Sequence, residues 1–289
     1  MSCVRDLLVN AIDYAGLFPP AGLGMEESVR NYAAYRKGPD RWALGRFVLP
    51  VARLEEFEKA AAPLLEEGEP WPLSVLGGTD LAADLRAIEA FRERHLKDAR
   101  IASLEIKTGT AAEISKAAAT IAGRIETFYE IPIAQDPREL LDAVHAVRGH
   151  AKVRTGGTAK GAAPSPAELA RFLDLAQSRT AFKATAGLHH AVRSVRPLTY
   201  EAGCDTDVMH GFLNVFIAAC IAPLRLKDKP VQAVLEEQDP RNLHVDPPGW
   251  KNLDLDPDEV RQFRSTFILS FGSCSFVEPI AELKELGLL

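Results

Sequence analysis

A chain of 289 residues with a hydrophobic fraction of 47% is large enough to form one extensive buried core. Its net charge is −6, and acidic and basic residues are mixed along the chain, so we expect no nucleic-acid partner. No apolar run is long enough to predict a membrane-spanning segment. The opening MSCVRD lacks the features of a secretory signal, and four scattered cysteines are typical of free thiols in a reducing compartment. We therefore expect one cytoplasmic domain over residues 1–289, with homo-oligomerisation left open.

Short β-type runs alternate along the chain with helical stretches, a pattern typical of βαβ units around a parallel sheet. The alternation recurs often enough to close a barrel, so we predict a single (β/α)8 TIM barrel of the α/β class. Gly16 weakens the first run, and Pro19 and Pro20 end it. The expected strands are 13–18, 46–50, 73–77, 102–107, 127–132, 151–155, 181–185 and 266–272.

Helix starts are marked by an N-cap residue followed three positions later by glutamate, the spacing of a capping box. We expect this box at Thr110, Asp136, Ser165 and Asp256, and proline follows the last three of these residues.

Three segments in the second half of the chain need separate interpretation. Apolar residues spaced by three and four predict a buried helix within 207–224. The proline-rich stretch 225–264 is long for a helix-to-strand connection, and we expect it to cap the carboxyl end of the barrel with Trp250 as its anchor. A last helix over 278–286 should close the barrel wall, with Gly287 ending it.

Charged side chains interrupt the expected strands that are otherwise apolar. Alternate residues of a barrel strand face the lumen, and the carboxyl ends of the strands form the mouth where active sites lie. Structural ion pairs would produce the same pattern, but charges at strand ends facing a mouth favour a ligand site. The residues concerned are Glu105, Lys107, Glu130, Lys152, Arg154, Lys183 and Thr185.

Two lysines stand at equivalent positions on the sixth and seventh expected strands. A lysine with its ordinary pKa of about 10.4 is protonated at neutral pH and cannot attack a carbonyl. Neighbouring strands lie about 4.8 Å apart, so Lys183 can approach Lys152 and is expected to lower the pKa of that residue.

The segments 152–157 (KVRTGG) and 182–188 (FKATAGL) resemble the paired lysine motifs of deoxyribose-phosphate aldolase and its class I aldolase relatives. The resemblance implies that Lys152 forms a Schiff base and that Lys183 depresses its pKa, without a cofactor. Glu105 stands near the place of the family's proton-relay aspartate, and Arg154 replaces a small residue. A guanidinium there favours an anionic group such as a carboxylate.

We therefore expect a carbon–carbon lyase or aldolase acting on a small, anionic oxo acid or sugar-like carbonyl compound through an imine on Lys152, with Glu105 or Glu130 relaying the proton. Two alternatives remain: a metal-dependent barrel lyase or isomerase using both glutamates and His189, and a noncatalytic barrel that binds a small ligand. The expected substrate-binding residues are Arg154, Lys107, Thr185, Gly156, His189, His190 and Ser273.

Overall fold

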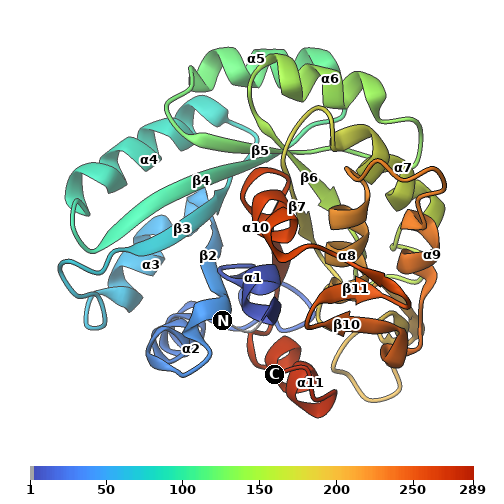
Figure 1. Ribbon diagram of the computed structural model, residues 1–289. Coiled ribbons are helices and arrows are strands. Elements are labelled where there is room, and N and C mark those ends of the chain that lie inside the picture. The colour runs from blue at the N-terminus through green and yellow to red at the C-terminus, as the bar shows by residue number, and fades with distance from the viewer. Residues whose placement is uncertain (1–2) are drawn as a thin grey trace.

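The computed structural model describes residues 3–289, and its centre is a closed barrel of eight parallel strands with helices around the outside (Figure 1). The strands follow the order β1-β13-β7-β6-β5-β4-β3-β2, and each neighbouring pair is parallel. This arrangement confirms the predicted (β/α)8 TIM barrel. The strands are β1 (Ile12–Tyr14), β2 (Leu44–Pro50), β3 (Trp71–Leu76), β4 (Ala99–Lys107), β5 (Glu126–Glu130), β6 (His150–Arg154), β7 (Phe182–Thr185) and β13 (Ile268–Ser273).

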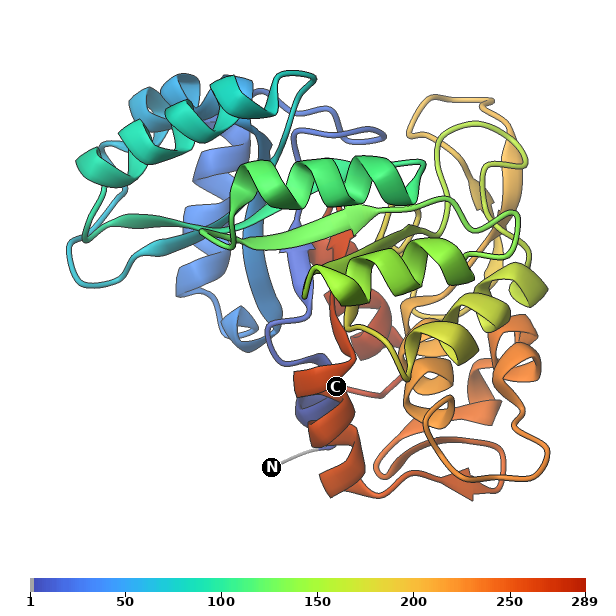
Figure 2. The same cartoon turned by 90° about the horizontal axis from the view of Figure 1, so that it is seen from above.

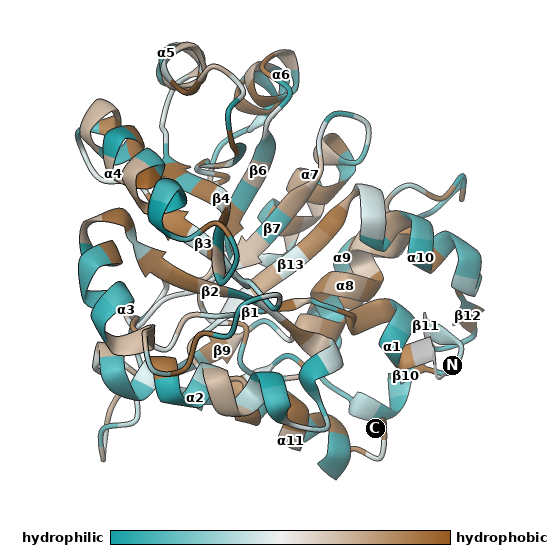
Figure 3. Cartoon of the chain, turned by 90° about the vertical axis from the view of Figure 1, so that its left-hand side faces the viewer, coloured by the Kyte–Doolittle hydropathy of each residue, from teal (hydrophilic) through white to brown (hydrophobic). Residues whose placement is uncertain are grey.

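The first strand is much shorter than expected because the chain folds back immediately after it. A Cβ atom on Gly16 would lie 2.2 Å from the hydroxyl of Tyr14, so only glycine fits where the backbone crosses that side chain. Figure 3 shows apolar residues along the strands and hydrophilic residues on the outer surfaces of the helices, as a barrel with a packed wall requires.

The outer helices follow the strands in the usual alternating order. Within residues 3–289, no helix is both long and apolar enough to cross a bilayer. The helices are α1 (Cys3–Leu8), α2 (Met25–Lys37), α3 (Leu54–Ala61), α4 (Leu81–Arg94), α5 (Ala111–Ile121), α6 (Arg138–Ala146), α7 (Pro166–Ala176), α8 (Phe212–Ile221), α9 (Val231–Glu236), α10 (Pro257–Thr266) and α11 (Val277–Glu285), with 3-10 turns at Arg41–Ala43, Val51–Arg53 and Pro240–Asn242.

The predicted helix caps differ in how completely they form. Thr110 and Ser165 form full capping boxes at the starts of α5 and α7. Asp256 accepts two backbone hydrogen bonds at the start of α10, whereas Asp136 bonds only to the amide of Arg138 because α6 begins after Pro137. The expected boxes at Asp136 and Asp256 are therefore not fully formed: α6 begins after Pro137, so Asp136 is not its N-cap, and Asp256 caps α10 by itself.

The segment 225–264 lies at the amino-terminal end of the barrel. It contains α9, most of α10 and a small antiparallel sheet of β10 (Leu243–Val245), β11 (Pro248–Trp250) and β12 (Leu253–Asp254), which contact α1, α7 and α8. A helix-to-strand connection starts where the helix ends, at the amino-terminal face, so this segment cannot easily reach the mouth. The expectation that it caps the carboxyl end is wrong.

The connection between β7 and α8 lies at the carboxyl end instead. It contains a hairpin of β8 (Ser194–Pro197) and β9 (Thr206–Met209), and the predicted helix within 207–224 begins only at Phe212. Figure 2 shows this yellow-orange hairpin at the end of the barrel opposite to α10. The amide of Gly161 donates a 2.7 Å hydrogen bond to Asp207, which ties the hairpin to the loop after β6.

Candidate active site

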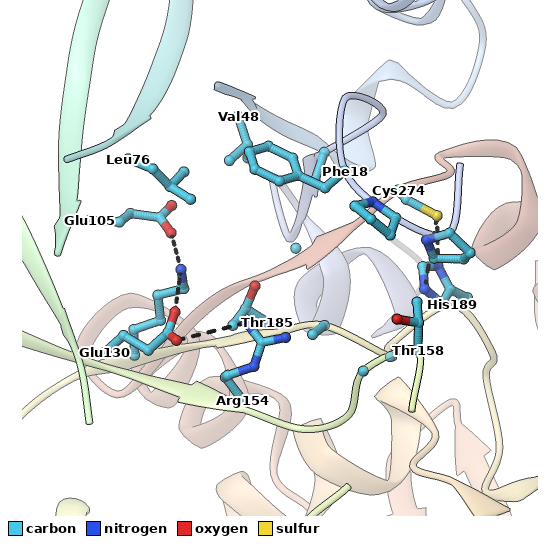
Figure 4. Close-up of a pocket in the computed structure, with 18 of the residues that line it drawn as sticks. Phe18, Val48, Leu76, Glu105, Glu130, Arg154, Thr158, Thr185, His189 and Cys274 are labelled. Atoms are coloured by element: carbon cyan, nitrogen blue, oxygen red, sulfur yellow. Dashed lines mark hydrogen bonds and ion pairs between the residues drawn. The ribbon is translucent and has the colours of Figure 1, made fainter. Parts of the chain in front are cut away.

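A cavity of about 330 Å³ opens at the carboxyl end of the barrel (Figure 4). Its floor and walls come from the ends of the strands and from the loops that follow them, which is where a TIM barrel places its active site. The volume is at the lower end of the range for small-ligand pockets. The lining residues are Ala15, Phe18, Pro19, Pro20, Val48, Leu76, Glu105, Glu130, Lys152, Arg154, Gly157, Thr158, Thr185, Ala186, Gly187, His189, Leu198, Met209, Gly272 and Cys274.

Lys152 lies on the cavity floor between two carboxylates. Its Nζ is 2.7 Å from Oε2 of Glu105 and 2.8 Å from Oε2 of Glu130. In Figure 4 the two ion pairs are drawn as dashed lines from Glu105 and from Glu130. Glu105 comes from β4 and Glu130 from β5, so three neighbouring strands meet at this amine.

Lys183 is paired in register with Lys152 but lies deeper, outside the cavity lining. Its Nζ is 2.6 Å from Oε1 of Glu105 and 2.5 Å from Oδ2 of Asp13. Gly45 makes room for this contact, because a Cβ atom on Gly45 would lie 2.4 Å from Oδ1 of Asp13. Lys183 therefore contacts neighbouring carboxylates and does not face the cavity.

Buried hydroxyl groups complete the hydrogen bonding of these carboxylates. Ser74 donates to Oε1 of Glu105 at 2.5 Å, and Ser103 lies 2.6 Å from Ser74. Ser270 donates to Oδ2 of Asp13 at 2.8 Å. Buried charges are tolerated when they are both paired and hydrogen-bonded, and this network meets both conditions.

The pKa of Lys152 and that of its partner Glu105 are set by the ion pair between them, which was not predicted from the sequence. Burial alone would raise the pKa of Glu105, but the two adjacent ammonium groups hold it well below its ordinary value. Burial lowers the pKa of Lys152, yet Glu105 and Glu130 outweigh burial and raise it above the ordinary lysine value. The net shift of the Lys152 pKa is therefore upward, because two carboxylates outweigh burial, and a like charge on Lys183 does not by itself produce the expected low value.

Arg154 stands nearer the mouth than Lys152. Its guanidinium lies 3.7 Å from Oε1 of Glu130, and its side chain is 53% exposed. Thr185 lines the cavity close to Arg154 in Figure 4. Lys107 lies outside this cavity and is exposed, in an adjoining surface hollow that also includes Glu130 and Arg154.

Besides Lys107, three other expected substrate-binding residues do not line the cavity. Gly156 packs its backbone against Gly187, where an added Cβ would lie 3.2 Å from the Cα of the partner. His190 turns away and places Nδ1 2.6 Å from Oε1 of Glu282 on α11. Ser273 is buried behind His189. None of these three residues therefore faces the cavity, because the local backbone and packing direct them elsewhere.

His189 and Cys274 lie together on the side of the cavity away from Glu105 and Glu130 (Figure 4). Nδ1 of His189 is 3.1 Å from the hydroxyl of Ser273 and 3.5 Å from the sulfur of Cys274. Burial, aided by the neighbouring His190, lowers the pKa of His189 to about 4. The imidazole is consequently neutral at physiological pH.

The metal-site hypothesis required Glu105, Glu130 and His189 to converge on one point. Both carboxylates instead bind Lys152, and the histidine lies on the other side of the cavity (Figure 4). Among residues 3–289, no group of three or more histidine, cysteine or carboxylate side chains has the arrangement of a metal site. The geometry thus does not bring the three expected ligands together.

Sequence reasoning missed several residues of the site. Asp13 lies within a predicted strand, and its charge in an apolar run was the same signal that revealed the lysines. Phe18 and Pro20 follow β1 and form part of the cavity wall, and Cys274 follows β13. Nothing in their local pattern distinguishes these loop residues from ordinary packing residues.

Comparisons with protein-family models, with curated proteins and with solved structures give no match to this chain. The similarity to class I aldolases therefore depends on residues 152–157 and 182–188 and stays a prediction.

Proposed function

We propose that the protein is a class I aldolase or related carbon–carbon lyase in which Lys152 forms an imine with a small 2-oxo acid. The observation that carries this proposal is the position of Lys152, whose amine is on the cavity floor 2.8 Å from the carboxylate of Glu130. It is also the one lysine among the lining residues within the described chain. An amine beside a proton acceptor in a small cavity is the arrangement that imine chemistry needs.

The raised pKa of Lys152 requires a trigger that makes the amine neutral. Substrate entry expels water, and the loss of water penalises both charges of the Lys152–Glu130 pair. Transfer of one proton from the ammonium group to the carboxylate removes both charges at once. The neutral amine is then formed where the carbonyl is bound.

The reaction can be written with balanced protons. The neutral amine adds to the carbonyl carbon, the oxygen takes the amine proton, and water leaves with the proton held by Glu130, which gives a protonated imine. The imine nitrogen accepts the electron pair when the carbon–carbon bond breaks, while Glu130 takes the proton of the hydroxyl that becomes the aldehyde. Glu130 then protonates the enamine carbon, and one water hydrolyses the imine to restore Lys152.

Glu130 suits the relay better than Glu105. Glu105 is fully buried, binds two ammonium groups and has a pKa well below its ordinary value, so it is a weak base. Glu130 is partly accessible from the cavity, and its second oxygen faces Arg154 at 3.7 Å. Arg154 can bind the carboxylate of the oxo acid, since a guanidinium matches a carboxylate in charge and shape.

The test is reductive trapping with borohydride in the presence of pyruvate and of longer 2-oxo acids. We expect a stable adduct on the unmodified protein, none on Lys152→Met, and an undiminished adduct on Lys97→Met, which removes an exposed lysine. Saturable binding without an adduct for any of these compounds would favour the noncatalytic ligand-binding alternative.

A further inference from the structure

The cavity has one charged end and one neutral end. Its charged lining residues within the described chain are Glu105, Glu130, Lys152 and Arg154, and ion pairs connect all four. The polar groups on the side away from these glutamates include His189 and Cys274 (Figure 4). The lining also includes the apolar side chains of Phe18, Leu198 and Met209.

His189 is held in one orientation and offers one ring nitrogen for a ligand. The hydroxyl of Ser273 accepts a 3.4 Å hydrogen bond from the amide of Ser275, so its own proton is free to donate to Nδ1 of His189 at 3.1 Å. With this donor assignment for Ser273, we assign the ring proton to Nε2. The partner of Nε2 in residues 3–289 is the sulfur of Cys274, at 3.9 Å, which is a weak contact.

An anion is poorly suited to this end of the cavity. His189 is buried with its pKa lowered to about 4, so it carries no positive charge at neutral pH. The carboxylate of Glu278 lies 3.9 Å from Nδ1 and would repel a second negative charge. A carboxylate or phosphate placed here would lose its hydration without gaining a cation.

We propose that His189 contacts the substrate, with Nε2 donating to an uncharged oxygen on the half that departs as the aldehyde. This inference rests on the proposed function and specifies its substrate class. The anionic group of the substrate lies beside the carbonyl that reacts with Lys152, where Arg154 can bind it. The half of the substrate that departs as the aldehyde is uncharged, bears a hydroxyl or carbonyl oxygen, and carries no phosphate.

The experiment measures aldol addition of pyruvate to four acceptor aldehydes: acetaldehyde, glycolaldehyde, glyoxylate and glycolaldehyde phosphate. Glycolaldehyde differs from acetaldehyde by one additional hydroxyl group, whereas glyoxylate and glycolaldehyde phosphate each carry an anionic group. We expect kcat/KM for glycolaldehyde to exceed that for acetaldehyde by about tenfold, the size of one well-formed neutral hydrogen bond. Both anionic acceptors should be poorer than glycolaldehyde.

Variants of His189 separate this contact from general packing. His189→Leu should reduce the glycolaldehyde-to-acetaldehyde ratio to about one, and His189→Gln should restore part of it because an amide can donate. His190→Gln is the matched control, since that histidine binds Glu282 outside the cavity, and it should keep the ratio. Trapping of pyruvate on Lys152 in each variant verifies that the reacting end is intact.

The two proposals fail in different ways. Absence of any trapped adduct in the unmodified protein would overturn the lyase proposal and this inference with it. A normal adduct combined with preference for glyoxylate or glycolaldehyde phosphate would overturn only the assignment of an uncharged aldehyde half. An unchanged ratio in His189→Leu would also overturn it.

Discussion

Lys183 and Glu105 are joined across the barrel lumen, with Nζ 2.6 Å from Oε1 and both side chains almost completely buried. They come from β7 and β4, which are not neighbouring strands. The other oxygen of Glu105 binds Lys152, so one carboxylate fixes the cavity amine and the deeper lysine together. An apolar layer would pack a barrel interior more simply, so this ionic centre supports the proposed imine chemistry more than a purely stabilising role.

Glu105→Gln should strongly destabilise the fold. The substitution breaks the buried ion pairs of Glu105 with Lys152 and with Lys183 and leaves each lysine one other carboxylate, and losing a partner of a buried ion pair costs up to about 3–5 kcal/mol. Urea unfolding measures the loss. Glu56→Gln, which removes an exposed pair with Arg53, is the matched control and should cost less than about 1 kcal/mol. Equal small effects in both variants would contradict the assigned network.

Glu105→Gln should also change how the free energy of unfolding depends on pH in the acidic range. The pKa of Glu105 is lowered in the folded state, so its stabilising contribution is full above the unfolded value of about 4.3 and declines as pH falls toward the folded value. We expect the unmodified protein to lose more free energy of unfolding than Glu105→Gln between about pH 5 and pH 3. The same dependence of the free energy of unfolding on pH in both proteins would contradict the low pKa of this carboxyl group.

Lys183→Leu tests how the deeper lysine affects the reacting amine. Its removal takes away a like charge and leaves Glu105 free to stabilise the Lys152 ammonium more strongly, so both effects raise the Lys152 pKa. Imine formation should fall by about tenfold or more at pH 7 and partly recover toward pH 9. Circular dichroism establishes that the variant is folded at both pH values. A deficit independent of pH would indicate a purely structural role.

Much of this architecture was predictable because local patterns encode it. Period-two placement of charges in apolar runs assigned Glu105, Lys152 and Lys183 to the lumen, and alternation of runs predicted the eight strands. The ion-pair partners of these residues were not predictable. The two-residue alternation of a strand tells which face a side chain is on, but it gives neither the depth of that side chain nor its reach across the lumen. Glu105 could therefore be placed, but its bridging of both lysines could not.

The loops were harder to interpret for a different reason. His189 and His190 are adjacent, yet one lines the cavity and the other binds Glu282, a difference that depends on the path of an irregular backbone. The misplacement of 225–264 was avoidable, because element order alone assigns a helix-to-strand connection to the amino-terminal end. The connection 186–211 follows a strand and is the one that lies at the mouth.

Glu130→Gln should impair turnover far more than folding. The amide keeps the shape of the side chain but cannot accept the proton of Lys152, so kcat should fall by about a hundredfold or more. Borohydride trapping should slow as well, because formation of the neutral amine needs the same acceptor. Glu113→Gln, in a capping box outside the cavity, is the control and should leave kcat unchanged. An equal loss of kcat in both variants would contradict the assignment of Glu130 as the proton relay.

The most direct test of the central claim is mass-spectrometric mapping of the residue that carries pyruvate after borohydride reduction. The account predicts one adduct per chain, on the peptide containing Lys152, and its disappearance in Lys152→Met while Lys183 stays unmodified. An adduct on Lys183 or on a lysine remote from the cavity, or full catalytic activity in Lys152→Met, would contradict it.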